Sequence, residues 1–221
     1  MIISIAGADE SVEPEQILEL SKEFPFVEWG ILWSMSRTRS PRYPGSEWTM
    51  DLAVLATRNP ELSLCHHYCG QVSKEFQIGE IPHALTVFRR IQINGFVPEQ
   101  AQSMPSIDQE IILQCRDDLA NHCLDYVKAR GSGKFSLLLD NSGGNGEVRD
   151  QWPSIKRLPF GYAGGIGPEN VQIALQKAKE NGASWIDMES GVRTNNEFDL
   201  GKVRSVLTQA RTFLQKENIR W

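Results

Sequence analysis

The chain has 221 residues and a formal net charge of −5, and 40% of its residues are hydrophobic while 23% are charged. This composition supplies a sizeable apolar core and excludes a largely disordered chain. The negative charge argues against nucleic-acid binding through a general basic surface, and no stretch approaches the roughly 20 apolar residues that cross a membrane. We expect a cytoplasmic protein whose partner is a small molecule and not nucleic acid or a membrane. The sequence predicts no oligomeric state.

The four cysteines are sparse, which is typical of reduced thiols and not of a disulfide framework. Cys65 and Cys69 flank the pair His66-His67, a sequence that suggests zinc. Neighbouring strand residues point to opposite faces, however, so these side chains cannot all reach one tetrahedral ion. We therefore predict no metal site in this segment.

Short apolar runs alternate with longer amphipathic stretches, and their number indicates the fold class. Strands are predicted at residues 2–6, 27–33, 62–67, 90–94, 111–115, 135–140, 158–163 and 185–187. Helices are predicted at residues 13–24, 50–57, 82–88, 117–129, 168–181 and 200–216, with weaker ones after the fourth and sixth strands. Eight such units favour an α/β protein with one domain, residues 1–221, folded as a closed (β/α)8 TIM barrel. Its functional site should lie at the carboxyl ends of the strands.

Two glycine-containing loops follow the seventh and eighth predicted strands. Gly164 and Gly165 allow the backbone to approach a ligand closely, and the free N–H groups at the start of the next helix favour an anion. Ser190 and Gly191 follow the eighth strand, with Glu189 immediately before them. Because the last two loops of such barrels commonly share one phosphate, we predict a phosphate-type site between them.

Several motifs resemble those of the phosphoribosylanthranilate isomerases, a family of tryptophan biosynthesis. Residues 163–171, Ala-Gly-Gly-Ile-Gly-Pro-Glu-Asn-Val, resemble its seventh-strand motif, and residues 187–192 resemble its closing motif. Residues 138–140 and 143–146, with Asp150 and Trp152, resemble its sixth-strand signature of an aspartate, a double glycine and a tryptophan. Residues 40–43 resemble its substrate-binding arginine segment, and residues 91–95 resemble its fourth strand. The resemblance covers essentially the whole barrel and implies the same fold.

The family's reaction is an Amadori rearrangement, in which the ring of a phosphorylated ribosylamine opens and an aldose-derived imine becomes a ketose-derived amine. It needs a general acid for the ring oxygen and a general base for the proton on the adjacent carbon. The resemblance implies Asp140 as the general acid and Arg42 as the group that holds the aromatic carboxylate. It further implies Asn94, Gly143 and Gly144 as substrate contacts, and Gly164, Gly165, Glu189, Ser190 and Gly191 as the phosphate site. No metal or organic cofactor is implied.

The general base is the first departure from the family pattern. In the family this base is a cysteine at the end of the first strand, where this sequence has Ala6. A methyl group cannot accept a proton. Asp9, His66 and His67 lie at or just beyond predicted strand ends and are the candidates for its replacement. Histidine has a pKa suited to this task near neutral pH.

Glu189 is the second departure, because the family has a small hydroxyl residue beside the phosphate at this position. A carboxylate within about 4 Å of a phosphate would be repelled by roughly 1 to 4 kcal/mol. Either Glu189 points away from the phosphate, or the ligand carries less negative charge there. The first hypothesis is an isomerase acting on a phosphorylated ribosylamine. The alternatives are a barrel paralogue that acts on a different small anion and a non-catalytic binding protein.

Overall fold

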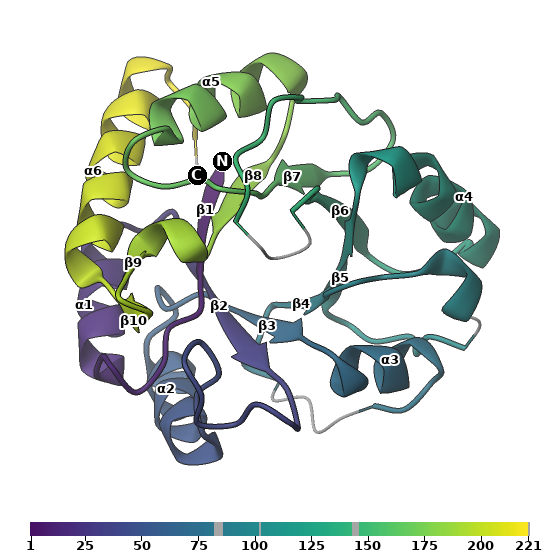
Figure 1. Cartoon of the computed structure of the whole chain (residues 1–221), viewed down its shortest axis with the longest axis horizontal. Helices are drawn as coiled ribbons and strands as arrows, with labels where there is room; N and C mark the ends of the chain where they lie inside the picture. The colour runs from purple at the N-terminus through teal and green to yellow at the C-terminus, as the bar shows by residue number, and fades with distance from the viewer. Residues whose placement is uncertain (82–85, 102, 143–145, 221) are drawn as a thin grey trace.

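Eight parallel strands form a closed barrel, in which each strand pairs with its neighbours in chain order and β8 pairs with β1 (Figure 1). The computed structural model describes residues 1–81, 86–101, 103–142 and 146–220. The barrel strands are β1 Ile2–Ala6, β2 Val27–Trp33, β3 Leu64–Tyr68, β4 Arg90–Ile93, β5 Glu110–Cys115, β6 Phe135–Leu139, β7 Phe160–Tyr162 and β8 Trp185–Met188. A short antiparallel pair, β9 Arg193–Thr194 and β10 Glu197–Phe198, follows β8. The predicted (β/α)8 barrel is confirmed.

The helices surround the barrel (Figure 1). They are α1 Pro14–Glu23, α2 Ser46–Arg58, α3 Gln71–Gln77, α4 Ala120–Arg130, α5 Val171–Asn181 and α6 Leu200–Lys216, with single 3-10 turns at η1 Pro98–Gln100, η2 Asp117–Leu119 and η3 Ser190–Val192. Helix α6 buries Val203, Val206 and Leu207, a three- to four-residue spacing that places one apolar face on the barrel. Within the described part of the chain, none of these helices combines the length and apolar character that crossing a bilayer requires.

The connection between β3 and β4 differs from the sequence prediction. We predicted a helix at residues 82–88, of which residues 82–85 lie outside the described residues and residues 86–88 form a turn and irregular chain. Helix α3 instead begins directly after Gly70, whose φ is +59°. Val72 and Phe76, four residues apart, are both buried and hold α3 against the barrel. Between β4 and β5 the described residues form only η1, and those between β6 and β7 contain no helix.

A buried ion pair lies inside the barrel, at the level of the first residues of β4. Arg90 Nε donates to both carboxylate oxygens of Glu28 at 3.0 Å, and Arg90 and Glu28 are only 6% and 2% exposed. The guanidinium of Arg90 lies over the ring of Trp185, 4.6 Å from its centroid. Since β3 lies between β2 and β4, this pair links two non-adjacent strands from within the barrel.

Candidate active site

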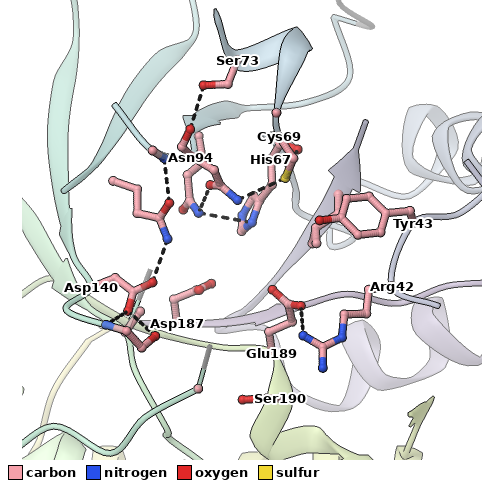
Figure 2. A pocket seen from close by; sticks show the side chains of 18 of the residues that line it. Arg42, Tyr43, His67, Cys69, Ser73, Asn94, Asp140, Asp187, Glu189 and Ser190 are labelled. Carbon is pink, nitrogen blue, oxygen red and sulfur yellow. Dashed lines mark hydrogen bonds and ion pairs between the residues drawn. The ribbon is translucent and has the colours of Figure 1, made fainter. Parts of the chain in front are cut away.

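One cavity of about 820 Å³ opens at the carboxyl ends of the strands. Its walls bring together His67 from β3, Asp140 from the end of β6, Asp187 from β8 and the loop residues Gly165 and Ser190. In Figure 2, the side chains of Asp140, Asp187 and His67 point toward the same central space. The barrel topology therefore gathers residues from distant parts of the sequence around a single ligand-sized volume.

Asp140 follows the last residue of β6 directly and is 4% exposed. Gln114, from β5, donates its Nε2–H to Oδ2 of Asp140 at 2.7 Å. Ser142 donates to Oδ1 from its backbone N–H at 3.0 Å and from its hydroxyl at 2.6 Å. These three hydrogen bonds fix the orientation of the carboxyl group at the edge of the cavity. The family resemblance implies a general acid at this residue, and the geometry allows that role.

The loops after β7 and β8 meet each other on one side of the cavity. Gly164 and Gly165 adopt φ angles of +110° and +58°, which residues other than glycine rarely adopt. A Cβ on Gly191 would collide with the backbone carbonyl oxygen of Ile166, so the two loops are in direct contact. A Cβ on Gly164 would lie 3.6 Å from Oδ1 of Asp140, so the same glycine loop also borders the carboxyl group. The glycines at these positions thus serve close backbone approach.

The side chain of Asn170 holds the loop after β7 through two hydrogen bonds to its backbone. Its Nδ2 donates to the carbonyl oxygen of Gly165 at 2.8 Å, and its Oδ1 accepts from the backbone N–H of Gly167 at 2.9 Å. The loop after β6 covers part of the same glycines, because a Cβ on Gly165 would lie 2.6 Å from the backbone nitrogen of Val148. The β7 loop is consequently held in one shape by contacts on both sides.

Of the substrate contacts predicted beside Arg42, only Asn94 lies within the described residues. Gly143 and Gly144 lie outside the described residues. Asn94 follows β4 and lines the cavity, where its Oδ1 accepts from Gln92 Nε2 at 2.8 Å and its Nδ2 donates to Cys69 Sγ at 3.2 Å. Asn94 is therefore part of a hydrogen-bonded wall, with Gln92 and Cys69 on either side of it.

Arg42 and Glu189 form an ion pair at the rim of the cavity, with 2.8 Å between Nη1 and Oε1 (Figure 2). Glu189 therefore points toward the β2 side of the mouth. Burial raises the pKa of Glu189, while Arg42 acts in the opposite direction. Of the two explanations drawn from the sequence, the orientation of Glu189 toward Arg42 agrees with the first.

Asp9 lies beyond β1 and does not border the cavity. Its Oδ2 accepts from Arg193 Nη2 and from the backbone N–H of Arg42, both at 2.7 Å, and its Oδ1 accepts from the Ser11 hydroxyl at 2.6 Å. Burial raises the pKa of Asp9, but the hydrogen bonds from Ser11, Arg42 and Arg193 outweigh it and leave the pKa below its usual value. Asp9 is thus engaged in holding the loops after β1, β2 and β8 together.

His67 fills the space beside Ala6 because Gly30 has no side chain. The register pairs Ala6 with Gly30 across β1 and β2. A Cβ on Gly30 would lie 2.6 Å from Nε2 of His67 and 3.0 Å from Cβ of Ala6. The imidazole of His67 therefore occupies the neighbourhood of the residue-6 side chain, where the family resemblance places a thiol. His67 is 2% exposed, and its Nε2 has no hydrogen-bond partner among the described residues.

The protonation state of His67 follows from its surroundings. Burial, with smaller effects from Arg90 and His66, lowers the pKa of His67 to about 3, so the imidazole is neutral at neutral pH. Nδ1 lies 3.3 Å from Nε2 of Gln92, the amide nitrogen that also donates to Asn94. With the amide assigned in this orientation, Nδ1 accepts and Nε2 carries the proton. His67 thus presents an N–H donor beside Ala6.

We expect Gly30→Ala to destabilise the protein by about 1–3 kcal/mol, the usual effect of overpacking a filled interior. The added methyl group would lie 2.5 Å from Cε1 and 2.6 Å from Nε2 of His67, so the ring would have to shift from its buried position. Urea unfolding measures the change. In a His67→Ala background the same substitution should cost much less, since the clash is gone, and equal costs in both backgrounds would contradict the contact described.

The Cys-His-His-Tyr-Cys segment does not converge on one point. His66 stacks between Trp33 and Phe88, with ring centroids 5.1 and 4.3 Å away, whereas His67 lines the cavity. Across the described residues, no group of three or more His, Cys, Asp or Glu side chains is arranged to hold a metal ion. Cys69 does line the cavity, and burial, with Glu189 nearby, raises its pKa to about 12.

Sequence reasoning did not single out Asp187, Gln92 and Gln114 as individual cavity residues, although all three line it. Each is a polar side chain between two apolar strand residues, near the strand's carboxyl end. Inward-facing polar residues at that level are expected to reach the mouth of a barrel. This pattern, read strand by strand, was the signal that could have identified them.

The fold and the site together define a (β/α)8 barrel with one cavity at the carboxyl ends of its strands, a buried carboxyl group on its wall and two touching glycine loops beside it. The chain belongs to the N-(5'phosphoribosyl)anthranilate (PRA) isomerase family, whose model matches residues 71–209. The family predicted from the sequence motifs is confirmed.

Relatives and solved structures agree with this placement. The N-(5'-phosphoribosyl)anthranilate isomerase of Oceanobacillus iheyensis is 26% identical over 146 residues, 53% of this chain and 70% of the relative. That of Rippkaea orientalis is 38% identical over 80 residues, so the match spans 34% of this chain and only 35% of the relative's length.

Among solved structures, the phosphoribosyl anthranilate isomerase from Thermotoga maritima gives a TM-score of 0.65 at 18% identity, covering 96% of this chain and 100% of that chain. A phosphoribosyl anthranilate isomerase in complex with reduced 1-(o-carboxyphenylamino)-1-deoxyribulose 5-phosphate gives a TM-score of 0.63 at 17% identity, with 96% and 100% coverage. At these identities the likeness shows the fold.

Proposed function

We propose that the protein isomerises N-(5'-phosphoribosyl)anthranilate by an Amadori rearrangement. The observation that carries this proposal is the convergence of Asp140, the β7 glycine loop and Ser190 on one cavity. A family neighbour binds a ligand that joins a carboxyphenylamino group to a sugar phosphate. The proposed substrate shares the phosphate and the aromatic carboxylate, so it needs an anion site and a cation, and the opening of its sugar ring also needs a proton donor for the ring oxygen.

The described residues supply these three functions. The backbone around Gly164, Gly165, Ser190 and Gly191 takes the phosphate, because glycine allows close approach of N–H groups to an anion. Arg42 takes the aromatic carboxylate: its guanidinium has five N–H donors, of which the ion pair with Glu189 uses only part.

Proton transfer and orientation fall to residues deeper in the cavity. Asp140 protonates the ring oxygen, oriented by Gln114 and Ser142. His67 is a neutral imidazole whose Nε2 is buried beside Gly30, so it supports the cavity wall and transfers no proton. Asn94 completes the wall beside it. No step in this scheme requires a metal or an organic cofactor.

The test uses the purified wild-type protein and Ala6→Cys, each incubated with N-(5'-phosphoribosyl)anthranilate and followed by chromatography of the ketose product. We expect turnover by the wild type and a higher kcat for Ala6→Cys, by up to roughly 100-fold, the lower end of what a general base contributes. Ala8→Cys is the matched control and should not raise kcat, because Ala8 packs in the main apolar core whereas Ala6 packs against the cavity residues Leu32 and Cys69.

Absence of turnover by both the wild type and Ala6→Cys would contradict the proposal. A thermal-shift screen against other phosphorylated sugars and aromatic carboxylates would then identify the ligand of the paralogue or binding protein considered from the sequence, since a specific ligand stabilises the folded state according to its affinity.

A further inference from the structure

Ser4 and Asp187 form a buried pair beneath the mouth of the cavity. They are paired in the register of β1 and β8, and the hydroxyl of Ser4 donates to Oδ1 of Asp187 at 2.5 Å. Asp187 is 7% exposed and lines the cavity. Its carboxyl group points into the central space between Asp140 and Glu189 (Figure 2). Asp187 is thus a fixed acidic group that faces the ligand volume and has no role in the scheme above.

The position of Asp187 relative to Ala6 matters for the missing base. Ser4 and Ala6 are two residues apart on β1 and so point to the same side of the strand, roughly 7 Å apart along it. Asp187 is hydrogen-bonded to the first of these residues and lines the cavity, and the second packs against Leu32 and Cys69, which line the same cavity. A group that replaces the family thiol must act from this side of the cavity, opposite the wall formed by Asn94 and Gln92.

Electrostatics favour proton exchange by this carboxyl group at neutral pH. Burial raises the pKa of Asp187 to about 7, with the Ser4 hydrogen bond lowering it, Glu189 and Asp140 raising it further and Arg90 lowering it. The candidates drawn from the sequence are less suited, because burial lowers the pKa of both His66 and His67 to about 3 and Asp9 does not border the cavity. Burial also raises the pKa of the cavity thiol of Cys69 to about 12. A general base works best when its pKa lies near the working pH.

We infer that Asp187 is the general base that removes the proton from C2 of the ring-opened substrate, in place of the thiol absent at residue 6. This inference rests on the proposed function. Asp140 gives its proton to the ring oxygen as the C1–O bond breaks, which leaves an iminium at C1. Asp187 takes the C2 proton, and the electron pair of that C–H bond forms the C1=C2 bond while the iminium becomes a neutral amine.

The second half of the reaction restores both groups. Asp187 returns its proton to C1, and the C2 hydroxyl loses its proton, by way of water, to the carboxylate of Asp140. The product carries a C2 carbonyl and a C1 methylene attached to the amine. Protons and electrons balance, and both carboxyl groups end as they began.

The experiment compares Asp187→Asn with wild type for kcat, KM and their pH dependence. Asn is nearly isosteric and can keep a hydrogen bond with Ser4, so we expect kcat to fall about 10²- to 10⁴-fold with little change in KM. In the wild type, kcat/KM should fall as the pH drops below about 7, because a protonated Asp187 cannot accept a proton. The residual activity of Asp187→Asn should lack that acidic limb.

Two further variants separate catalysis from structure. Ser4→Ala removes the hydrogen bond that lowers the pKa of Asp187, so the acidic limb should move to higher pH while the protein still turns over. Ala6→Cys combined with Asp187→Asn should recover activity, because the thiol then supplies the base. A purely structural role of Asp187 would give neither the shifted limb nor the rescue.

The outcomes are distinguishable. Turnover by Asp187→Asn at the wild-type rate, or an acidic limb that Asp187→Asn and Ser4→Ala leave in place, would overturn the assignment of the base while leaving the isomerase intact. Activity in Ala6→Cys without activity in the wild type would also overturn it. Absence of turnover in every variant would instead reject the proposed function, and the assignment of Asp187 with it.

Discussion

Replacement of Asp140 by Asn is expected to lower kcat for the proposed isomerisation about 10²- to 10⁴-fold, the usual contribution of one general acid. Asn keeps the size of the side chain and an oxygen that accepts from Ser142, but it has no acidic proton to give to the ring oxygen. KM should change little, because the contacts proposed for the ligand with the glycine loops and Arg42 do not involve this proton. Steady-state kinetics with N-(5'-phosphoribosyl)anthranilate measures both constants.

Asp118→Asn is the matched control for this change. Asp118 lies just after β5, near the same end of the barrel, but its side chain is 65% exposed and it does not line the cavity. The kcat of the Asp118→Asn variant should stay at the wild-type value. If Asp140→Asn were no slower than Asp118→Asn, Asp140 would have no part in proton transfer.

Arg90→Met is expected to reduce the free energy of unfolding by about 3–5 kcal/mol. The substitution removes the partner of Glu28 and leaves a carboxylate that is 2% exposed without its ion pair. An unpaired charge in a barrel interior costs far more than the packing that Met supplies. Urea unfolding at neutral pH gives the value.

Two comparisons identify the ion pair as the cause. Arg204→Met breaks a pair with Glu23 whose side chains are 53% and 38% exposed, and should cost no more than about 1 kcal/mol. Arg90→Met combined with Glu28→Leu should be more stable than Arg90→Met alone, because no buried charge is left over. A loss for Arg90→Met as small as that for Arg204→Met would contradict this account.

The barrel could be predicted from the sequence because its signals are local. Each strand is a short apolar run between turn residues, and the run near Ile2 or Phe135 can be recognised without any knowledge of its neighbours. The helix after β3 could not be placed in this way. The segment 71–77 is short and rich in polar side chains, so its sequence alone does not predict a helix. The helix is stabilised by the contacts of the buried side chains of Val72 and Phe76 with the barrel.

The site was predictable where it depends on sequence motifs and not where it depends on side-chain direction. Asp140 and the β7 glycines sit in fixed positions relative to their strands, and the sequence placed them on the cavity correctly. The ion pair between Arg42 and Glu189 joins residues 147 positions apart, and no local pattern encodes it. The place of the His67 ring depends on the missing side chain of Gly30 on another strand, which becomes visible only when the two strands are paired.

Ala6 has a consequence for how the protein tolerates oxidants and alkylating agents. These reagents attack thiolates, and all four cysteines are buried, with the pKa of the cavity residue Cys69 raised to about 12 by burial. Under the proposed mechanism, catalysis by the carboxyl groups of Asp140 and Asp187 depends on no sulfur atom. An Amadori isomerase built in this way would keep its activity under peroxide stress that inactivates a relative whose base is a cysteine.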